Sequence, residues 1–328
     1  MRRSLALLTL GLLTSAAAII ACSQAAPVNK LPVQNDDQGD TSNDDTSKRD
    51  AGTTTNELPP GADPPLADGG KPPGRIFAHT DNKLYRYDPL AGALTLVGPF
   101  GCLPRDETQA LGTPDNDQVI DLALDRIGNM YATTFWRFLK VDPTSGSCTV
   151  IRTDTEQAVY PNSLSFVTIN SQEALVGFSF DPQGDATVYS RIALDTGEMT
   201  SIGNLNPDVP ITPGVTYGIS GDLISLVRTN GNTYAAVKNV DGTGNDLLAV
   251  LDPASGNITK ILGDTGQQGF YGLGFWAGKA YGFTSSGNIY EIDVTNGAAT
   301  LALAAKDENG LGIAWFGAGV TTDSPTAP

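Results

Sequence analysis

Five stretches of this sequence repeat one pattern, and that repeat limits the possible folds more than any other feature. In each stretch a short apolar or aromatic segment leads into a turn that contains Asp and Gly, and a second β-prone segment follows. Asp opens a tight turn, Pro presets φ for the next residue, and Gly adopts the left-handed conformation that lets the chain return. The copies lie at residues 84–98, 140–149, 192–200, 250–259 and 290–300. Each copy is expected to form a β-hairpin, with a tighter turn in the third, where Asp195 and Gly197 are close together.

The spacing of these hairpins predicts how they assemble. Residues 75–318 hold all five and divide into units of about 49 residues. Repeats of about 40 to 50 residues with several strands each are typical of β-propellers. Additional strands are expected ahead of the later hairpins, at residues 121–124 and 129–132, 163–166 and 174–177, 223–227 and 233–237, and 272–275 and 279–282. The predicted fold is therefore all-β, a five-bladed β-propeller.

The first unit begins at residue 75 and lacks an innermost strand. A matching segment lies near the other end of the chain, where residues 310–316 echo residues 272–276. A propeller whose first blade takes strands from both ends of the domain leaves no open sheet edge. We therefore expect a C-terminal strand at 310–316 to close the ring. The tail, residues 319–328, is polar and rich in small residues and is expected to be disordered.

The N-terminus has the features of a secretory signal peptide. Two arginines precede an apolar run over residues 5–20, which is short for a membrane span. The run leads into Ile-Ile-Ala-Cys at residues 19–22, which resembles the lipobox of bacterial lipoproteins. The resemblance implies that residues 1–21 are removed and that Cys22 carries diacylglyceryl and palmitate. It also implies a lipid anchor in the bacterial cell envelope, in the outer membrane, with a periplasmic or surface orientation. The alternative is an ordinary buried or disulfide-bonded Cys22.

Residues 22–74 join this leader to the repeats and have a different composition. After Cys22 the segment holds eight Pro, nine acidic residues and no aromatic residue. Such a segment cannot bury enough apolar surface to offset the entropy of ordering. It is therefore expected to be a disordered tether, about 40 Å long as a random coil. The acidic run at residues 36–45 is interpreted as part of a solvated spacer, with cation binding as the alternative.

The repeat units together resemble the β-propeller repeats of bacterial surface and periplasmic proteins, a class that includes YVTN-type and quinoprotein-like repeats. The shared feature is a strand, an Asp-x-x-x-Gly turn and a returning strand that ends in Gly98, Gly203 or Gly263. Quinoprotein repeats carry a Trp shortly after the turn Gly, and no copy in this chain has one. Pyrroloquinoline quinone is therefore not expected.

The net charge of −16 argues against a nucleic-acid partner, which would need clustered Lys and Arg. A monomer is expected.

Few residues offer catalytic or metal-binding chemistry. His79 is the only histidine, so a histidine metal cluster is excluded by count, and His79 is interpreted as an ordinary strand residue. Cys102 and Cys148 remain after Cys22; they can pair in an oxidising compartment, with two separate buried thiols as the alternative. Residues 115–121 resemble part of a calcium loop but lack its Gly and its late Glu. The prediction is no cofactor and no metal, with calcium at 115–121 as the alternative.

The innermost strands of a propeller direct their ends into the axial channel. Asp121, Ser163, Tyr271 and Gly312 are therefore expected nearest the channel mouth. Most of the Asp residues are accounted for by turns, and no pair of carboxylates stands out as catalytic.

These features favour a membrane-anchored, envelope-exposed propeller that binds or scaffolds a protein or glycan without catalysis. The alternative is a glycoside hydrolase or lyase that uses carboxylates in the channel. Trp276 and Trp315 occupy echoing positions, where exposed rings would stack on sugars. Core packing between blades is preferred for both.

Overall fold

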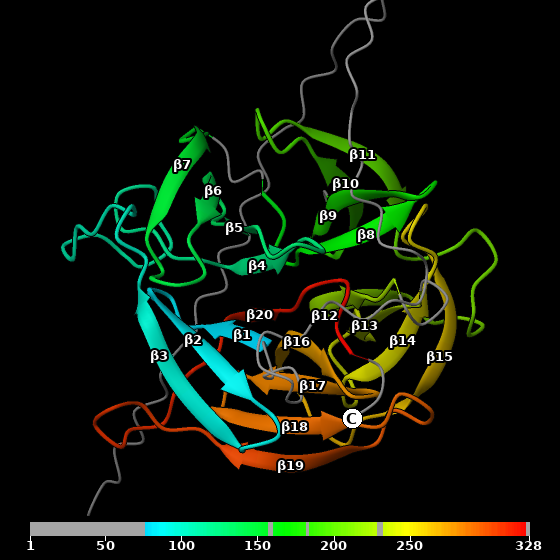
Figure 1. Cartoon of the computed structure of the whole chain (residues 1–328). Helices are drawn as coiled ribbons and strands as arrows, with labels where there is room; N and C mark the ends of the chain where they lie inside the picture. The colour runs from blue at the N-terminus through cyan, green and yellow to red at the C-terminus, as the bar shows by residue number, and fades with distance from the viewer. Residues whose placement is uncertain (1–75, 157–159, 182–183, 228–231, 326–328) are drawn as a thin grey trace, which may run out of the picture. The chain divides into compact units, whose positions relative to one another are not determined.

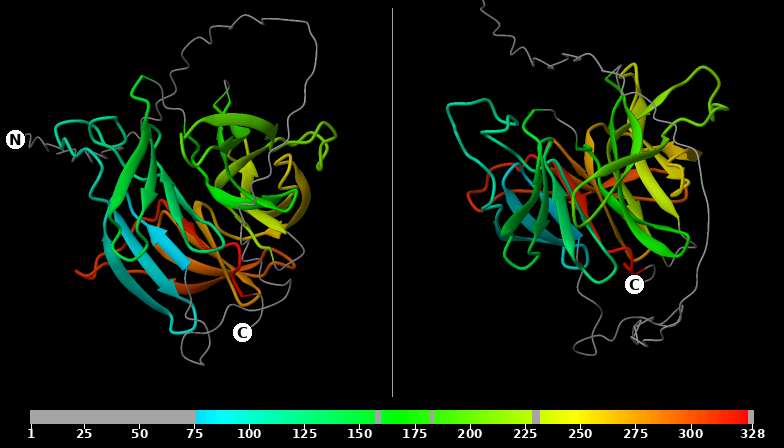
Figure 2. Two further views of the ribbon diagram at one scale, coloured as in Figure 1. Left: turned by 45° about the horizontal axis from the view of Figure 1, so that its top comes forward. Right: turned by 90° about the horizontal axis from the view of Figure 1, so that it is seen from above.

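The computed structural model describes residues 76–156, 160–181, 184–227 and 232–325. These residues form five four-stranded antiparallel sheets arranged in a ring, and no helix occurs among them (Figure 1, Figure 2). The prediction of an all-β, five-bladed propeller is therefore confirmed. The predicted signal peptide, the lipidated Cys22 and the tether to residue 74 lie outside the described residues. Within the described part of the chain, no helix is long and apolar enough to cross a membrane.

Each blade is one sheet, with its strands in order from the axis outward. The first blade contains β20 (Gly317–Gly319), β1 (Ile76–His79), β2 (Lys83–Asp88) and β3 (Ala93–Pro99). The second contains β4 (Asp121–Leu124), β5 (Met130–Thr133), β6 (Arg137–Val141) and β7 (Cys148–Thr153), and the third β8 (Ser165–Ile169), β9 (Gln172–Phe180), β10 (Ala186–Ile192) and β11 (Met199–Asn204). The fourth contains β12 (Tyr217–Ser225), β13 (Thr233–Asn239), β14 (Leu247–Leu251) and β15 (Ile258–Asp264), and the fifth β16 (Phe270–Trp276), β17 (Lys279–Thr284), β18 (Asn288–Ile292) and β19 (Ala299–Ala304). The innermost strands β4, β8, β12, β16 and β20 contact one another around the axis (Figure 1).

A C-terminal strand closes the ring, as predicted, but it starts later than the sequence suggested. β20 pairs with β1 in the register Ala78↔Ala318. The expected closing segment 310–316 instead belongs to the connection from β19, where the Asp307 amide donates to the Leu311 carbonyl oxygen (2.8 Å) and Lys306 pairs with Gly312. The residues with the Gly-Leu-Gly echo form this connection, so pairing with β1 begins only at Gly317.

The repeated turn has the geometry that its residues predict. The turn glycines all have positive φ, between 60° and 78°, at Gly92, Gly146, Gly197, Gly256 and Gly297. The Asp side chain accepts a hydrogen bond from the backbone two residues later, as in Asp142 Oδ1 with the Thr144 amide (2.8 Å). The third turn is not tighter than the others. The Gly197 amide donates to the Ala193 carbonyl oxygen (2.8 Å), the same spacing that joins Gly146 to Asp142, so Ala193 takes the place of the turn Asp.

The glycines that end the outer strands let neighbouring blades approach closely. A Cβ atom on Gly98 would lie 2.0 Å from the Ser145 carbonyl oxygen, and one on Gly203 would lie 1.9 Å from that of Ser255. A Cβ atom on Gly263 would likewise lie 1.8 Å from the Asn296 carbonyl oxygen, in the turn of the fifth blade. The Asp-x-x-x-Gly turn of one blade therefore packs directly on the last strand of the preceding blade.

The hydrophobic core lies between consecutive blades. Buried side chains of the first and second blades form one cluster, the second and third another, and the third and fourth a further one. A cluster that spans the fourth, fifth and first blades contains Trp315, which packs edge-on against Tyr85 and Phe283 at ring-centroid distances of 5.5 and 5.6 Å. Trp276 is buried in the same cluster. Both tryptophans are therefore core residues, as the sequence interpretation preferred.

The residues after β20 are ordered as far as residue 325 and lie across the ring. The Val227 amide donates to the Thr322 carbonyl oxygen (2.9 Å), and the Ala277 amide donates to that of Pro325 (2.8 Å). The Thr322 hydroxyl donates to Glu173. This segment thus contacts the third, fourth and fifth blades beside the turns that follow their innermost strands. It differs from the disordered tail expected from its composition because these hydrogen bonds hold it in place.

Replacing Gly203 by Ala tests the close approach between blades. The new methyl group would overlap the Ser255 carbonyl oxygen, and overpacking of this kind costs about 1 to 3 kcal/mol. Urea unfolding should therefore show a lower free energy of unfolding for Gly203→Ala than for the parent. Gly312→Ala is the matched control, because its Cβ would meet nothing within 4 Å. Equal losses in the two variants would contradict this account of blade packing.

Candidate functional site

The five blades contribute equivalent residues to one cavity at the propeller axis. Five of its lining residues, one per blade, are Ile120, Asn162, Gly221, Tyr271 and Phe316. Ile120 and Phe316 directly precede the innermost strands of their blades, and Asn162 lies three residues before β8. Tyr271 is the second residue of β16, and Gly221 lies at a register shift inside β12. The cavity has a volume of about 420 Å³, within the roughly 300 to 1,000 Å³ of small-molecule sites. We call this cavity the axial mouth.

The rim of the axial mouth is aromatic and carries few charges. Phe180 and Tyr271 are 52% and 40% exposed, and the Phe135 ring lies 6.4 Å from that of Phe180. Among the described lining residues, Lys238 is the one cation and Asp185 the one anion. Exposed aromatic surface beside balanced charges suits an uncharged ligand better than a strongly charged one.

Two amide side chains of the axial mouth have unsatisfied oxygens. Gln118 Oε1 and Asn162 Oδ1 are buried, and neither has a hydrogen-bond partner among the described residues. Leaving a buried polar atom unpaired costs about 1 to 3 kcal/mol. Both oxygens are acceptors, so a ligand that donates hydrogen bonds would relieve this cost.

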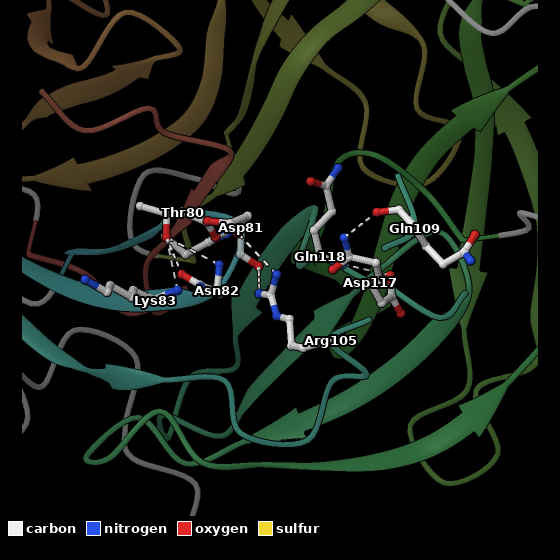
Figure 3. A network of polar contacts seen from close by, with 10 residues as sticks. Thr80, Asp81, Asn82, Lys83, Arg105, Gln109, Asp117 and Gln118 are labelled. Atoms are coloured by element: carbon white, nitrogen blue, oxygen red, sulfur yellow. Dashed lines mark hydrogen bonds and ion pairs between the residues drawn. The ribbon is translucent and has the colours of Figure 1, made fainter. Parts of the chain in front are cut away.

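Gln118 is held at the axial mouth by the long connection between β3 and β4. Figure 3 shows how this connection is fastened to the first blade: Arg105 donates to the Asp81 side chain and to its carbonyl oxygen, both at 3.3 Å. Next to Gln118, Asp117 pairs with Arg137 at 2.5 Å, and both side chains are buried. Burial raises the pKa of Asp117, while the Arg137 guanidinium opposes the rise. The ion pair leaves Gln118 fixed beside the cavity.

Beneath the axial mouth lies a second ring of residues that forms its floor. These residues, each next in sequence to one of the five named above, are Asp121, Ser163, Asp222, Gly272 and Gly317, and all are buried. Asp121 accepts hydrogen bonds from the amides of Leu122 (2.8 Å) and Leu164 (2.7 Å). Each carboxyl of the floor thus joins two neighbouring blades.

Asp222 repeats this arrangement on the other side of the axis. It accepts hydrogen bonds from the amides of Leu223 (2.6 Å) and Leu273 (2.8 Å), which belong to the fourth and fifth blades. The Asp121 and Asp222 carboxyl groups influence each other electrostatically across the axis. Burial raises the pKa of both well above the usual range, and the charge of Asp222 raises that of Asp121 further. Because burial and mutual repulsion both disfavour two negative charges at this site, the pair favours retaining a proton.

His79 completes the buried polar group at the floor. Its Nδ1 donates to the Thr80 carbonyl oxygen (2.8 Å), and its Nε2 lies 4.0 Å from Asp121 Oδ1. Burial lowers the pKa of His79 to about 4, against the opposing effect of the Thr80 hydrogen bond. A Cβ on Gly317 would lie 2.3 Å from Asp121 Oδ1 and 2.5 Å from His79 Nε2. The floor is therefore close-packed, and the side chains of Asp121 and Asp222 have no exposed surface.

The residues expected at the channel mouth occupy three different positions. Tyr271 lines the axial mouth, whereas Asp121 and Ser163 lie one layer deeper, in the floor. Gly312 lies away from the axis in the exposed connection between β19 and β20. Gly317 occupies the axial position of the first blade instead, because β20 begins seven residues after the start of the Gly-Leu-Gly echo at Gly310.

The sequence reasoning missed Asp222, and a signal for it was present. Asp222-Leu223 repeats Asp121-Leu122, and both dipeptides hold an axial carboxyl next to the amide that it accepts from. Gln118 and Asn162 were also missed. Asn162 directly precedes Ser163, so an alignment of the innermost strands would have included it.

Cys102 and Cys148 form a disulfide in the structure, with a Cα–Cα distance of 5.4 Å. The bond joins the connection after β3 to the first residue of β7, and so links the first blade to the second. In residues 115–121, Asp117 pairs with Arg137 and Asp121 binds backbone amides. Within the described ranges, no group of three or more His, Cys, Asp or Glu residues is arranged to hold a metal ion.

The fold and the site together define a five-bladed β-propeller with a hollow mouth above a sealed floor. No family model and no curated protein matches the sequence. A chain in the crystal structure of a nidogen/laminin complex is similar in fold, with a TM-score of 0.41 and 12% identity over 77% of this chain and 98% of that one. A structural genomics protein of unknown function from Bacteroides thetaiotaomicron VPI-5482 is also similar, with a TM-score of 0.42 and 14% identity over 76% of this chain and 64% of that one. Neither likeness assigns a ligand or an activity to this chain.

The carboxyl pair of the floor should make stability fall as pH rises. The folded state raises the pKa of Asp121 and Asp222, so their favourable contribution is complete below the unfolded pKa near 4 and is lost as pH increases through the folded values. Urea unfolding at several pH values between 4 and 8 should show that the advantage of the parent over Asp222→Asn shrinks as pH rises. His79 is present in both proteins, so its contribution to the pH dependence of stability cancels in the comparison.

The control for this experiment is Asp142→Asn in an exposed turn. The Thr144 hydroxyl and amide lower the pKa of Asp142, so its contribution is lost only when pH falls below the normal range for Asp. The advantage of the parent over Asp142→Asn should therefore not shrink between pH 4 and pH 8. A pH-independent difference for Asp222→Asn would contradict the raised pKa of the carboxyl pair.

Proposed function

We propose that this chain is a lipid-anchored recognition module of the bacterial envelope that binds a glycan or protein through the axial mouth and performs no chemistry. The observation that carries the proposal is the cavity of about 420 Å³ with exposed aromatic rings on its rim. Rigid β-sheets hold this cavity, and loops on such scaffolds are common places for recognition. Because the floor is closed, a ligand can enter the cavity from one side only.

The arrangement of carboxyl groups supports binding over hydrolysis. A glycoside hydrolase needs two acids about 5 to 10 Å apart that both reach the substrate. Asp121 and Asp222 are fully buried and each accepts two backbone hydrogen bonds. Asp185 is the one acidic residue among the described residues that line the axial mouth. The paired acids are thus better suited to holding blades together than to proton transfer to a substrate.

The anchor is proposed from the sequence alone. The apolar run that leads into Cys22 matches the order of residues in a lipobox, and the 52 residues from 23 to 74 have the composition of a flexible spacer. A tether about 40 Å long would let the axial mouth face away from the membrane surface. The bacterial outer membrane is the proposed location, and a monomer the proposed state.

Replacing Cys22 by Ser tests the anchor. The variant lacks the thiol that would carry the lipid, so it should move from the membrane fraction to the soluble fraction and lose labelling by a fatty-acid analogue. Cys102→Ser is a suitable comparison, because its thiol is engaged in a disulfide and labelling should persist. Labelling that survives in Cys22→Ser would contradict the lipobox interpretation.

The full chain carrying Cys22→Ser provides a soluble protein for testing recognition. Immobilised glycans and envelope protein fragments should reveal saturable binding, and the same glycans in solution should remain intact. Phe180→Ala removes an exposed ring from the rim and should weaken binding about tenfold. Leu301→Ala is the control, since Leu301 is 53% exposed on the outer strand β19. Turnover that Asp121→Asn abolishes without unfolding the protein would replace this proposal with the hydrolase.

A further inference from the structure

We infer that the axial mouth receives the terminal ring of a neutral saccharide, whose hydroxyl groups donate to Gln118 and Asn162 and whose apolar face packs on Tyr271. This inference rests on the proposed recognition function and names its ligand class. It follows from three properties of the cavity: which polar atoms lack partners, how charge is distributed, and how the cavity is closed.

The unpartnered atoms select a ligand that donates hydrogen bonds. Gln118 and Asn162 line the cavity from two neighbouring blades, and the side-chain oxygen of each is a buried acceptor without a partner among the described residues. The terminal torsion of an amide side chain is broad, so a small rotation can turn each oxygen toward a ligand. A saccharide ring offers several hydroxyl donors around a single plane. A peptide brings one carbonyl acceptor for every amide donor in a fixed geometry, whereas each saccharide hydroxyl can rotate to donate where an acceptor faces it.

The charges disfavour ionic ligands. A phosphate, sulfate or carboxylate supplies only acceptors and could donate to neither of the unpaired oxygens of Gln118 and Asn162. The described lining contains a single cation, Lys238, balanced by Asp185. Burial raises the pKa of Asp246, and the charge of Lys238 opposes that rise, so Lys238 already interacts with an acidic side chain of the protein. The net charge of the chain, −16, adds a general repulsion of polyanions.

The shape of the cavity favours the end of a chain over its middle. The floor residues beneath it are buried, and Gly317 leaves no space beside Asp121. A ligand can therefore enter only from the open side. Tyr271 lines the axial mouth with 40% of its area exposed, and its ring can pack against the C–H groups of a sugar.

The experiment measures dissociation constants for the full chain carrying Cys22→Ser by isothermal titration. The probes are neutral tetrasaccharides of glucose, mannose, galactose and N-acetylglucosamine, with tetramers of galacturonic acid and of glucosamine as anionic and cationic counterparts. A neutral probe should bind at least tenfold more tightly than either charged counterpart. Preference for a charged tetramer would overturn the inference.

Substitutions in the axial mouth then locate the bound ring. Gln118→Met and Asn162→Leu each remove an unpartnered oxygen, so thermal stability should be unchanged or higher while affinity falls about fivefold. Tyr271→Ala should lower affinity about tenfold, whereas Tyr271→Phe, which keeps the ring, should bind like the parent. Leu301→Ala again serves as the control.

The remaining outcomes separate this inference from the proposed function. Binding of a protein or peptide that the axial-mouth variants weaken, with no neutral saccharide bound, overturns the saccharide inference and leaves recognition standing. Saccharide binding that none of these variants alters overturns the inference and moves recognition to another surface. No saturable binding to any probe overturns both.

Discussion

The ring depends on how the backbone amides at its axis find acceptors. An innermost strand pairs with its blade on one side only, so its amides on the other side point toward the axis, where water is excluded. Each buried amide without a partner would cost about 1 to 3 kcal/mol. Asp121 and Asp222 supply acceptors for four of these amides, in the second, third, fourth and fifth blades. Two side chains thus join four blades, and their own burial is offset by those bonds and by a retained proton.

This arrangement explains why acidic residues at a propeller axis need not be catalytic. A general acid or a nucleophile must reach the substrate, and the floor of this propeller is close-packed around its carboxyl pair. The same pKa shifts that draw attention to functional sites also arise when buried groups hold a structure together. The chemistry open to a ligand therefore belongs to the layer above, where amides and aromatic rings replace carboxylates.

The features that could be predicted from the sequence are those fixed by local chemistry. An Asp and a Gly at fixed spacing determine a turn whatever lies around them, so the hairpins and the number of blades followed directly. The closing strand was misplaced because Gly-Leu-Gly at residues 310–312 matches the innermost strand of the fifth blade in sequence, while the turn at Asp307 decides where pairing begins. Similarly, Ala193 replaces the turn Asp because backbone hydrogen bonds alone can set that turn.

The candidate site was less predictable because it is assembled from residues distant in sequence. Tyr271 could be placed at the axis by its position in a repeat, but Gln118 reaches the cavity only through a long connection held by Arg105 and by the Asp117–Arg137 pair. Such contacts leave no periodic signal. The disulfide and the order in the C-terminal segment likewise depend on which segments the ring brings together.

The two faces of the ring differ in a way that bears on function. One face carries the Asp-x-x-x-Gly turn in nearly the same form in each blade, and packing between blades accounts for that similarity. The face with the axial mouth carries connections that differ in length and composition, from the few residues before β16 to the long segment before β4. A fivefold repeat needs no such variety to fold. Because the irregular segments surround a cavity with unpaired acceptors, recognition is the function that best accounts for where the repeat is broken.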